Sequence, residues 1–419
     1  MWGMHKLGPQ GCLDARRLQK MLWALRGRDT VVLLGAAQAG DVGRYGLIGL
    51  PQEVHLWSEP PDLEAVLALQ AGKLALLGLS YEYGHEFNYL PTHSAPRGQP
   101  TLFLTLFQAA LLLDFQQGTF SLVGQEGPEA AALSQVCAAQ EEPVWRESKA
   151  QLRALVDDVE HGRRIEAAKE SIRRGDIYQA NITRRLALES AELDVLALLW
   201  DLYQTNPVAH AAYVRVAGFE MLSNSMETLL TYAGQTRQAA SFPIKGTCAR
   251  TEARPETVDL SLDPKEKAEH VMIVDLVRND LGKVCKPGSV EVPRLMGIDG
   301  FFGVWHGVSR VEGILAENVG RAELMRALFP GGSITGAPKR RAMQIIQALE
   351  EEGRGFYTGS LALLTPHEDI SMSILIRTLV KDASGWNLAV GGGIVSDSIA
   401  EREIAETWEK VAVFREVLS

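Results

Sequence analysis

Short apolar runs fill the first part of this chain, and longer amphipathic segments follow from about residue 150. The runs Val31–Leu34, Leu102–Leu106 and Phe120–Val123 are separated by Gly, Pro and Asp turns, which predicts short strands. Gln125–Gln151 is rich in Ala, Glu and Gln and is typical of a linker that runs into a helix. The change of pattern predicts a boundary near residue 150.

Helices and strands alternate beyond that boundary. The charged segment Leu152–Arg174 is followed by Gly175 and predicts one long helix. A second helix is predicted to begin at Pro264, a favoured first helical residue, and to stop at Gly282. The segment Ile370–Val380 predicts one strand.

The composition is that of an ordinary globular enzyme, with 419 residues of which 46% are hydrophobic and 22% charged. A net charge of -10 and the lack of any Lys/Arg-rich block argue against a nucleic-acid surface. The scattered cysteines (Cys12, Cys137, Cys248 and Cys285) predict reduced thiols, and neither a disulfide frame nor a zinc site. Apolar runs are too short to span a bilayer, and no secretion signal is recognisable, so we expect a cytoplasmic protein.

Lys245 is the most informative single residue, because it lies between an apolar run and a Gly-Thr turn. Partial burial lowers the pKa of a lysine and favours the neutral amine, which is a nucleophile. The alternative is a lysine whose stem packs against apolar neighbours while its ammonium group reaches water.

Acidic residues on two predicted helices are candidate metal ligands. Glu269 shares a helical stripe with apolar residues and is predicted to point inward. Glu403, Glu406 and Lys410 are spaced to lie on one face of a C-terminal helix. Carboxylates are the ligands that magnesium prefers. The alternative for the C-terminal stripe is an exposed, salt-bridged face.

Three other segments hold polar residues in unusual settings. His306 lies in a strand-like apolar run, where a core histidine is the commoner outcome. Phe329–Lys339 is a Gly-rich turn that enters a helix, but Pro338 breaks the pattern of a nucleotide-binding loop. Arg377 is predicted to share a strand face with Ser371 and Ser373 and to bind a carboxylate, the alternative being a structural ion pair.

Taken together, these segments resemble the chorismate-utilising enzymes, a family that includes anthranilate, aminodeoxychorismate, isochorismate and salicylate synthases. The segments that carry the resemblance are, in chain order, Gly175–Arg184, Leu222–Leu230, Pro243–Thr247, Ala268–Val284, His306–Ser309, Phe329–Lys339, Tyr357–Ser360, Ile374–Thr378 and Gly391–Lys410. The resemblance implies an α/β (α+β) fold of stacked, mostly antiparallel sheets flanked by helices, with the active site between the layers. It divides the chain into a divergent N-terminal region, 1–150, and a chorismate-binding catalytic region, 151–419.

Two positions discriminate between members of the family. Isochorismate and salicylate synthases resemble one another in having a lysine base where this chain has Gln179. An amide cannot deprotonate water, so the addition of water to chorismate is disfavoured in this chain. Anthranilate synthases typically have alanine at the position of Lys245, whereas this chain is similar to aminodeoxychorismate synthases there. We therefore expect amination of chorismate at ring carbon 4, with an anthranilate-type synthase as the first alternative and a non-enzymatic scaffold as the second.

The resemblance also implies roles for individual residues. Lys245 would be the nucleophile, Glu227 the general acid and His306 a neighbour of the substrate ring, while Glu269, Glu403 and Glu406 would hold magnesium. The residues implied in substrate binding are Gly246, Thr247, Tyr357, Arg377, Gly391, Gly392, Gly393 and Lys410. Because no cysteine motif for glutamine hydrolysis is recognisable, ammonia is expected from solution or from a separate glutamine amidotransferase subunit.

Overall fold

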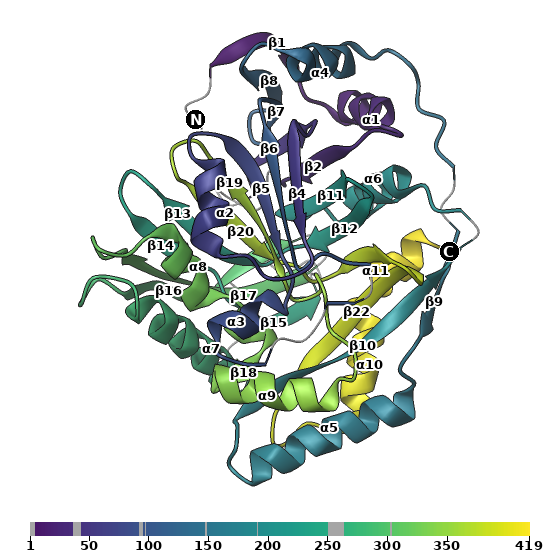
Figure 1. Cartoon of the computed structure of the whole chain (residues 1–419). Coiled ribbons are helices and arrows are strands. Elements are labelled where there is room, and N and C mark those ends of the chain that lie inside the picture. Colours follow the sequence, from purple (N-terminus) through teal and green to yellow (C-terminus); the bar gives the residue numbers. More distant parts are fainter. Residues whose placement is uncertain are drawn as a thin grey trace.

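A computed structural model describes residues 5–36, 43–91, 95–96, 98–146, 149–190, 192–249, 264–301 and 304–419. The side chains at 246–249, 264–266, 300–301 and 304 lie outside this description. Two large sheets of antiparallel strands form the centre of the molecule (Figure 1).

Within the described residues, the first sheet has 12 strands, in the order β1-β8-β7-β3-β2-β11-β12-β21-β22-β10-β18, with β9 also paired to β10. Their bounds are β1 Lys6–Cys12, β2 Thr30–Leu34, β3 Tyr45–Gly49, β7 Ala109–Asp114, β8 Thr119–Gly124, β9 Gln151–Ala154, β10 Gln179–Glu189, β11 His210–Val216, β12 Phe219–Ser225, β18 Gly336–Ala337, β21 Thr378–Asp382 and β22 Gly385–Ile394. Strands from both sides of residue 150 share this sheet, since β2 pairs with β11.

The second sheet has 10 strands in the part of the chain that the structure describes, in the order β15-β17-β14-β13-β20-β19-β5-β6-β4, with β16 also paired to β17. Their bounds are β4 Glu53–Trp57, β5 Leu74–Leu79, β6 Leu102–Phe107, β13 Thr228–Ala233, β14 Gln238–Ser241, β15 Ile244–Ala249, β16 Glu291–Phe301, β17 Val304–Ile314, β19 Ser360–Leu364 and β20 Ile370–Ile374. Here too the N-terminal region contributes, because β5 pairs with β19.

Helices cover the outer faces of the two sheets (Figure 1). The first sheet is covered by α1 Ala15–Ala24, α4 Pro128–Ala138, α5 Asp158–Arg173, α6 Val195–Thr205, α9 Lys339–Leu349, α10 Ala400–Lys410 and α11 Ala412–Val417. The second is covered by α2 Leu63–Gln70, α3 Tyr83–Phe87, α7 Pro264–Gly282 and α8 Arg321–Leu328. A third apolar cluster, which includes Met221, Phe103 and Leu361, fills the space between the sheets. The expectation of stacked antiparallel sheets flanked by helices is confirmed.

The segment Ile370–Val380 is not the single strand that its sequence predicts. It forms β20 in the second sheet and β21 in the first, and the chain crosses between the sheets at residues 375–377. Arg377 adopts a left-handed backbone conformation, with φ 52°, at this crossing. The predicted strand face that joins Ser371, Ser373 and Arg377 is therefore wrong, because apolar alternation does not reveal a change of sheet.

A second crossing lies beside the first. The chain passes from β12 to β13 through Met226 and Glu227. Hydrogen bonds join the two crossings: the Ile374 amide donates to the Glu227 carbonyl at 3.0 Å, and the Asn224 amide donates to the Arg377 carbonyl at 3.0 Å. Both segments consequently lie between the sheets at one place.

Two other local predictions also need correction. Leu152–Arg174 is divided into strand β9 and helix α5, and the linker predicted over Gln125–Gln151 contains helix α4. In both cases the charged or Ala-rich composition hides a short element that is formed by pairing or packing with distant residues.

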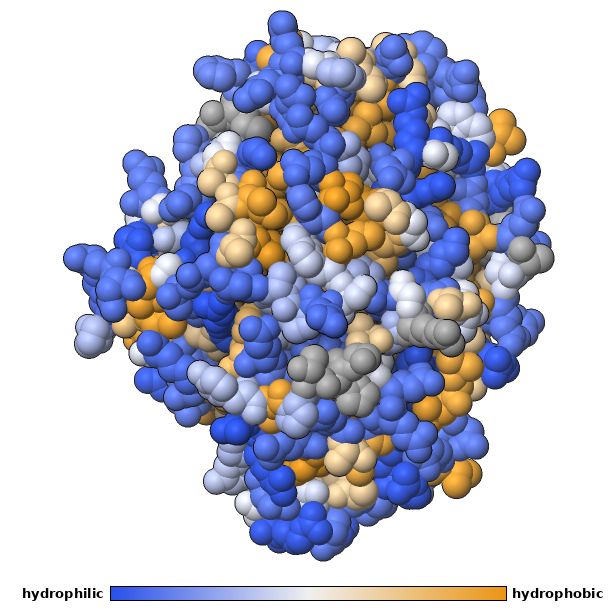
Figure 2. Space-filling model, viewed as in Figure 1, coloured by the Kyte–Doolittle hydropathy of each residue, from blue (hydrophilic) through white to orange (hydrophobic). Residues whose placement is uncertain are grey.

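The described surface is polar over most of the face in view, with hydrophobic side chains in small patches (Figure 2). No described helix is both long enough and apolar enough to cross a membrane. The described cysteines Cys12, Cys137 and Cys285 are free thiols.

A buried arginine fastens the C-terminal helix α10 to the first sheet. The Arg184 guanidinium donates to the Thr407 hydroxyl from Nε at 3.1 Å and from Nη2 at 2.6 Å, and it pairs with Asp158 of α5. Its side chain is 0% exposed. Thr407 lies on α10 between Glu403 and Lys410 and next to Glu406, so this contact helps to fix the position of the acidic face.

Thr407→Val should lower the free energy of unfolding by roughly 1.5–3 kcal/mol, because it removes hydrogen bonds from a buried charged group at nearly constant shape. Thr407→Ser keeps the hydroxyl and is the matched control. Urea denaturation measures both. Equal losses in the two variants would mean that the methyl group, and not the hydrogen bond, provides the stability.

Candidate active site

Lys245 extends from β15 and meets a carboxylate from helix α7. Its Nζ lies 3.2 Å from Glu269 Oε2, and the two side chains are 26% and 17% exposed. The expected inward position of Glu269 is therefore observed, and Lys245 is partly buried. The alternative, in which the Lys245 stem packs and its ammonium group reaches water, differs from this arrangement because the ammonium group pairs with a carboxylate.

Three consecutive glycines of β22 lie at the centre of a group of charged side chains. A Cβ atom at Gly393 would be 3.6 Å from Lys245 Nζ, and one at Gly392 would be 3.2 Å from Glu403 Oε2 and 3.7 Å from Lys410 Nζ. Lys410 Nζ also donates to the Gly391 carbonyl at 2.8 Å. A Cβ atom at Gly392 would crowd the Glu403 carboxylate, whereas Cβ atoms would make ordinary contacts with the two lysines, so the glycines leave room for groups from α10 and β15 beside one strand.

Glu406 holds Lys410 in an ion pair at 2.7 Å, and these side chains are 48% and 38% exposed. Glu406 and Lys410 thus form part of the exposed, salt-bridged face that was the alternative interpretation of the C-terminal helix. An ion pair this exposed adds little stability, which leaves both groups available to a ligand.

Glu227 is a buried carboxyl group at the crossing from β12 to β13. Burial raises its pKa to about 7, while a hydrogen bond from Ser333 and the charges of Lys245 and Lys410 act to lower it. Ser333 Oγ donates to Glu227 Oε1 at 2.7 Å. The influence of both lysines places Glu227 in the same group as the glycines. A carboxyl group with this pKa can hold or release a proton near neutral pH.

Arg377 lies at the other crossing. Its side chain is half-buried and makes no ion pair with any carboxylate in the described parts of the chain. Burial lowers its pKa to about 10. The alternative of a structural ion pair is therefore not observed there, and an unpaired, partly buried guanidinium is suited to an anionic ligand.

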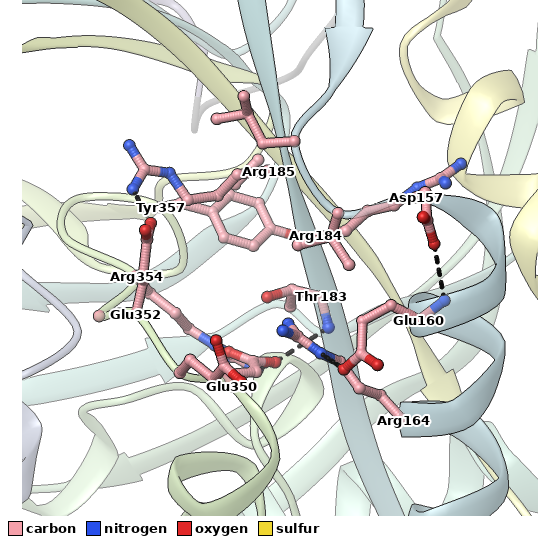
Figure 3. A pocket seen from close by; sticks show the side chains of 15 residues that line it. Asp157, Glu160, Arg164, Thr183, Arg184, Arg185, Glu350, Glu352, Arg354 and Tyr357 are labelled. Carbon is pink, nitrogen blue, oxygen red and sulfur yellow. Dashed lines mark hydrogen bonds and ion pairs between the residues drawn. The ribbon is translucent and has the colours of Figure 1, made fainter. Parts of the chain in front are cut away.

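Tyr357 lies close to this crossing. The amide of its neighbour Thr358 donates to the Leu375 carbonyl at 2.7 Å. The Tyr357 side chain is buried, burial raises its pKa, and it borders a cavity of about 280 Å³ (Figure 3).

The remaining predicted residues belong to β15 and β17. His306 is buried in β17, directly opposite Thr247 of β15. Gly246 and Thr247 have described backbones, but the side chain of Thr247 lies outside the described part of the structure. The strand placement of His306 agrees with its sequence context.

Comparison with known proteins identifies the family. The family model described as chorismate binding enzyme matches residues 39–416. The chain belongs to the chorismate-binding enzyme family.

Curated members of this family differ in their activities. The chain is 36% identical to aminodeoxychorismate synthase component 1 of Klebsiella aerogenes over 368 residues, which are 84% of this chain and 78% of that protein. It is 44% identical to an anthranilate synthase component 1 of Haloarcula marismortui over 253 residues, 59% of this chain and 51% of that protein. The match thus spans about half of the anthranilate synthase and more than three quarters of the aminodeoxychorismate synthase.

Solved structures agree on the fold. Anthranilate synthase component I from Streptococcus pneumoniae has a TM-score of 0.80 at 23% identity, covering 88% of this chain and 92% of that one. The menaquinone-specific isochorismate synthase of Escherichia coli has a TM-score of 0.75 at 17% identity, covering 99% and 96%.

The carboxylates of this chorismate-binding chain fit magnesium in donor type. Glu269, Glu403 and Glu406 supply oxygen ligands, and magnesium commonly takes only one or two carboxylates from a protein. No group of three acidic, histidine or cysteine side chains is assembled within the described residues. Glu269 and Glu406 each hold a lysine at present, so a metal ion would compete with these ammonium groups.

Sequence reasoning missed several residues that support the site. Arg354 donates to Glu350, to the Ile334 carbonyl and to the Asn181 carbonyl, and all of these contacts are buried. Its segment, Glu350–Arg354, is a charge run that resembles a solvated surface. Ser333, in the Gly-rich turn, gave no signal as a partner for Glu227, because only the fold brings the two together.

Ser333→Ala should raise the pKa of Glu227 above its value of about 7, because the serine hydroxyl stabilises the carboxylate. A shift of roughly half to one pH unit is expected, since such a hydrogen bond contributes about 1 kcal/mol. The carboxyl stretching band in difference infrared spectra, assigned with Glu227→Gln, follows the titration. Ser333→Thr keeps the donor and should titrate as the wild type does; a wild-type titration in Ser333→Ala would contradict the assigned contact.

Proposed function

We propose that this chain is the chorismate-converting component of an aminodeoxychorismate synthase, which forms 4-amino-4-deoxychorismate from chorismate and ammonia. The observation that carries the proposal is the position of Lys245, whose amine lies beside Gly393 and Glu269 near the buried acid Glu227. The relatives that match 84% of the chain have the same name, which supports the choice.

The first half of the reaction forms a covalent adduct. The neutral Lys245 amine attacks ring carbon 2, the ring double bond shifts, and the bond from carbon 4 to its hydroxyl breaks. Hydroxide is a poor leaving group, so protonated Glu227 supplies a proton and water departs. Glu227 is suited to this step because its pKa of about 7 leaves much of it protonated at neutral pH.

Ammonia completes the second half. Its lone pair forms a bond to carbon 4, the double bond shifts back, and the bond from carbon 2 to Nζ breaks. The adduct nitrogen carries a positive charge, so the lysine leaves as a neutral amine and the charge passes to the new ammonium group. Glu227 then regains a proton from solvent, which restores the starting state.

The substrate's two carboxylates need separate partners. Arg377, which has no ion pair within the described chain, and Tyr357 next to it are suited to the enolpyruvyl carboxylate. Lys410 and the amides of Gly391–Gly393 are suited to an anionic group near α10. Gly246, Thr247 and His306 lie on the adjoining strands and would border the ring.

Glu269 and Glu406, with Glu403, would hold magnesium, which supplies positive charge to the ring carboxylate when bound. Glu269 would exchange its contact with Lys245 for the metal, and Glu406 its contact with Lys410. Both lysines would then face the substrate.

Ammonia would come from solution or from a separate glutamine amidotransferase subunit. With such a partner the chain would supply the 4-aminobenzoate branch of folate synthesis.

An anthranilate synthase is the second candidate, favoured by the 44% identity to the Haloarcula enzyme over 253 residues. Lys245 discriminates between the two, because a direct attack of ammonia on carbon 2 has no need of a lysine nucleophile there.

Incubation of the chain with chorismate, magnesium and ammonium salt, followed by mass and NMR identification of the product, tests the proposal. 4-Amino-4-deoxychorismate supports it, and anthranilate contradicts it.

Glu269→Ala should lower product formation by roughly 100-fold or more, because even residues that only orient metal ligands cost 10–100-fold. Asp275→Ala, on the exposed face of the same helix, is the matched control and should retain activity. The rate is measured against magnesium concentration. Full turnover of the wild type in excess chelator would rule out the metal.

Lys245→Ala should lose most 4-amino-4-deoxychorismate formation and gain slow amination at carbon 2, because the nucleophile is absent while the rest of the pocket remains. Lys245→Arg retains the positive charge but lacks a nucleophilic amine at neutral pH, so it should be equally impaired. Product analysis by liquid chromatography measures both. If arginine restores the normal product, Lys245 acts through its charge alone.

A further inference from the structure

Glu82 is a buried carboxyl group in the N-terminal region, at the junction of β5 and α3. It is 2% exposed, and burial raises its pKa to about 7. Its carboxylate accepts hydrogen bonds from the backbone amides of Arg354 at 2.5 Å and Gly355 at 3.0 Å. Burying a carboxyl group is costly unless its contacts compensate. The role of Glu82 is therefore to be sought in the turn that it binds.

Other groups of the N-terminal region hold the same turn, which comprises residues 354–356. The Tyr81 amide donates to the Gly355 carbonyl at 2.8 Å, and the Phe356 amide donates to Gln99 Oε1 at 3.3 Å. Gly355 has φ 61°, a conformation that favours glycine. A Cβ atom at Gly355 would lie 2.1 Å from Gln99 Oε1. The path of the turn is thus set by residues more than 250 positions earlier in the chain.

The turn leads directly into the segment that carries Tyr357. The next residue, Thr358, has φ 60°, and its amide donates to the Leu375 carbonyl at 2.7 Å. The Leu375 amide donates in return to the Gly359 carbonyl at 2.9 Å. Arg377 follows two residues later, at the crossing between the sheets. A displacement of the turn would consequently be passed to both Tyr357 and the crossing.

The side chain of Arg354 extends the contacts of the turn. Its guanidinium donates to the Asn181 carbonyl at 2.6 Å and to the Ile334 carbonyl at 3.0 Å. The guanidinium carbon lies 4.6 Å from the centre of the Tyr81 ring, in a cation–π contact. Arg354 and Tyr357 line one side of the same cavity (Figure 3). The turn is therefore attached to β10 and to the Gly-rich turn as well as to the N-terminal region.

We propose that Glu82 is a positioning residue for substrate binding: by holding the turn at residues 354–355, it sets the places of Tyr357 and Arg377. This inference rests on the proposed function, in which those two residues hold the enolpyruvyl carboxylate. Glu82 acts through them and has no part in the chemistry at Lys245.

A positioning role and a purely structural role have different kinetic consequences. If Glu82 only stabilises the fold, its loss lowers the fraction of active protein, and so lowers kcat without changing the KM of the molecules that remain folded. If Glu82 positions Tyr357 and Arg377, its loss weakens the binding of chorismate and raises KM, while turnover at saturation is retained.

Glu82→Gln tests the role, because it keeps the size of the side chain and replaces one acceptor oxygen by an amide nitrogen, which faces a backbone N–H. The KM for chorismate should rise roughly tenfold, which corresponds to about 1.4 kcal/mol of lost binding. The kcat at saturating ammonia should stay within about twofold of the wild type. Both constants are measured from the loss of chorismate. Glu86→Gln, at an exposed position of α3, is the matched control and should change neither.

A cyclohexadiene carboxylate without the enolpyruvyl group, used as a competitive inhibitor, locates the effect. Its inhibition constant should be the same in Glu82→Gln and in the wild type, because it lacks the carboxylate that Tyr357 and Arg377 hold. An inhibition constant that rises as much as KM would mean a general disturbance of the site, and would contradict the positioning role.

The two ideas fail in different ways. A wild-type product other than an amine at carbon 4 contradicts the proposed function, whatever the variants do. An unchanged KM in Glu82→Gln, or a fall in kcat alone, contradicts the role of Glu82. If Glu82→Gln does not fold, Gln99→Met decides by the same constants: it removes one neutral contact with the turn, so KM should rise roughly threefold.

Discussion

The site depends on two adjacent crossings of the chain from one sheet to the other. The segments between β12 and β13 and between β20 and β21 are joined by backbone hydrogen bonds, which hold them next to each other. One crossing carries Glu227 and the other carries Arg377. Burial between packed sheets raises the pKa of a carboxyl group and so favours its neutral form. An arginine in the same setting stays charged but loses part of its hydration. The crossings thus place a carboxyl group of raised pKa and a guanidinium group of lowered pKa on adjacent segments.

Charges around the crossings are arranged to favour a dianionic ligand. Among the described side chains, Lys245 pairs with Glu269 and Lys410 pairs with Glu406, while Arg377 forms no ion pair. Behind them, Arg354 and Glu350 form a fully buried pair that also satisfies backbone groups of β10. These hydrogen bonds join residues 350–354 to β10. The front residues are partly exposed and can exchange their partners for substrate or metal.

Much of this could be predicted from the sequence, but not all of it. The stacked antiparallel sheets, the inward Glu269 and the strand position of His306 follow from apolar periodicity and from the resemblance to chorismate-utilising enzymes. The break at Arg377 could not be predicted, because alternation looks the same on both sides of a change of sheet. The contacts from Ser333 to Glu227 and from Arg184 to Thr407 join residues more than 100 positions apart, and neither has a local signature. The contacts of Glu82 with the turn at residues 354–355 emerge only once its surroundings are known.

The central claim is that Lys245 acts as a nucleophile, and the most direct measurement is the intact mass of the protein after incubation with chorismate and magnesium without ammonia. The account predicts a species heavier by chorismate minus one water, with the added mass on the peptide that contains Lys245. It also predicts that added ammonia removes this mass and releases 4-amino-4-deoxychorismate. Normal turnover through a protein that never gains mass, or a mass gain on a different residue, would contradict it.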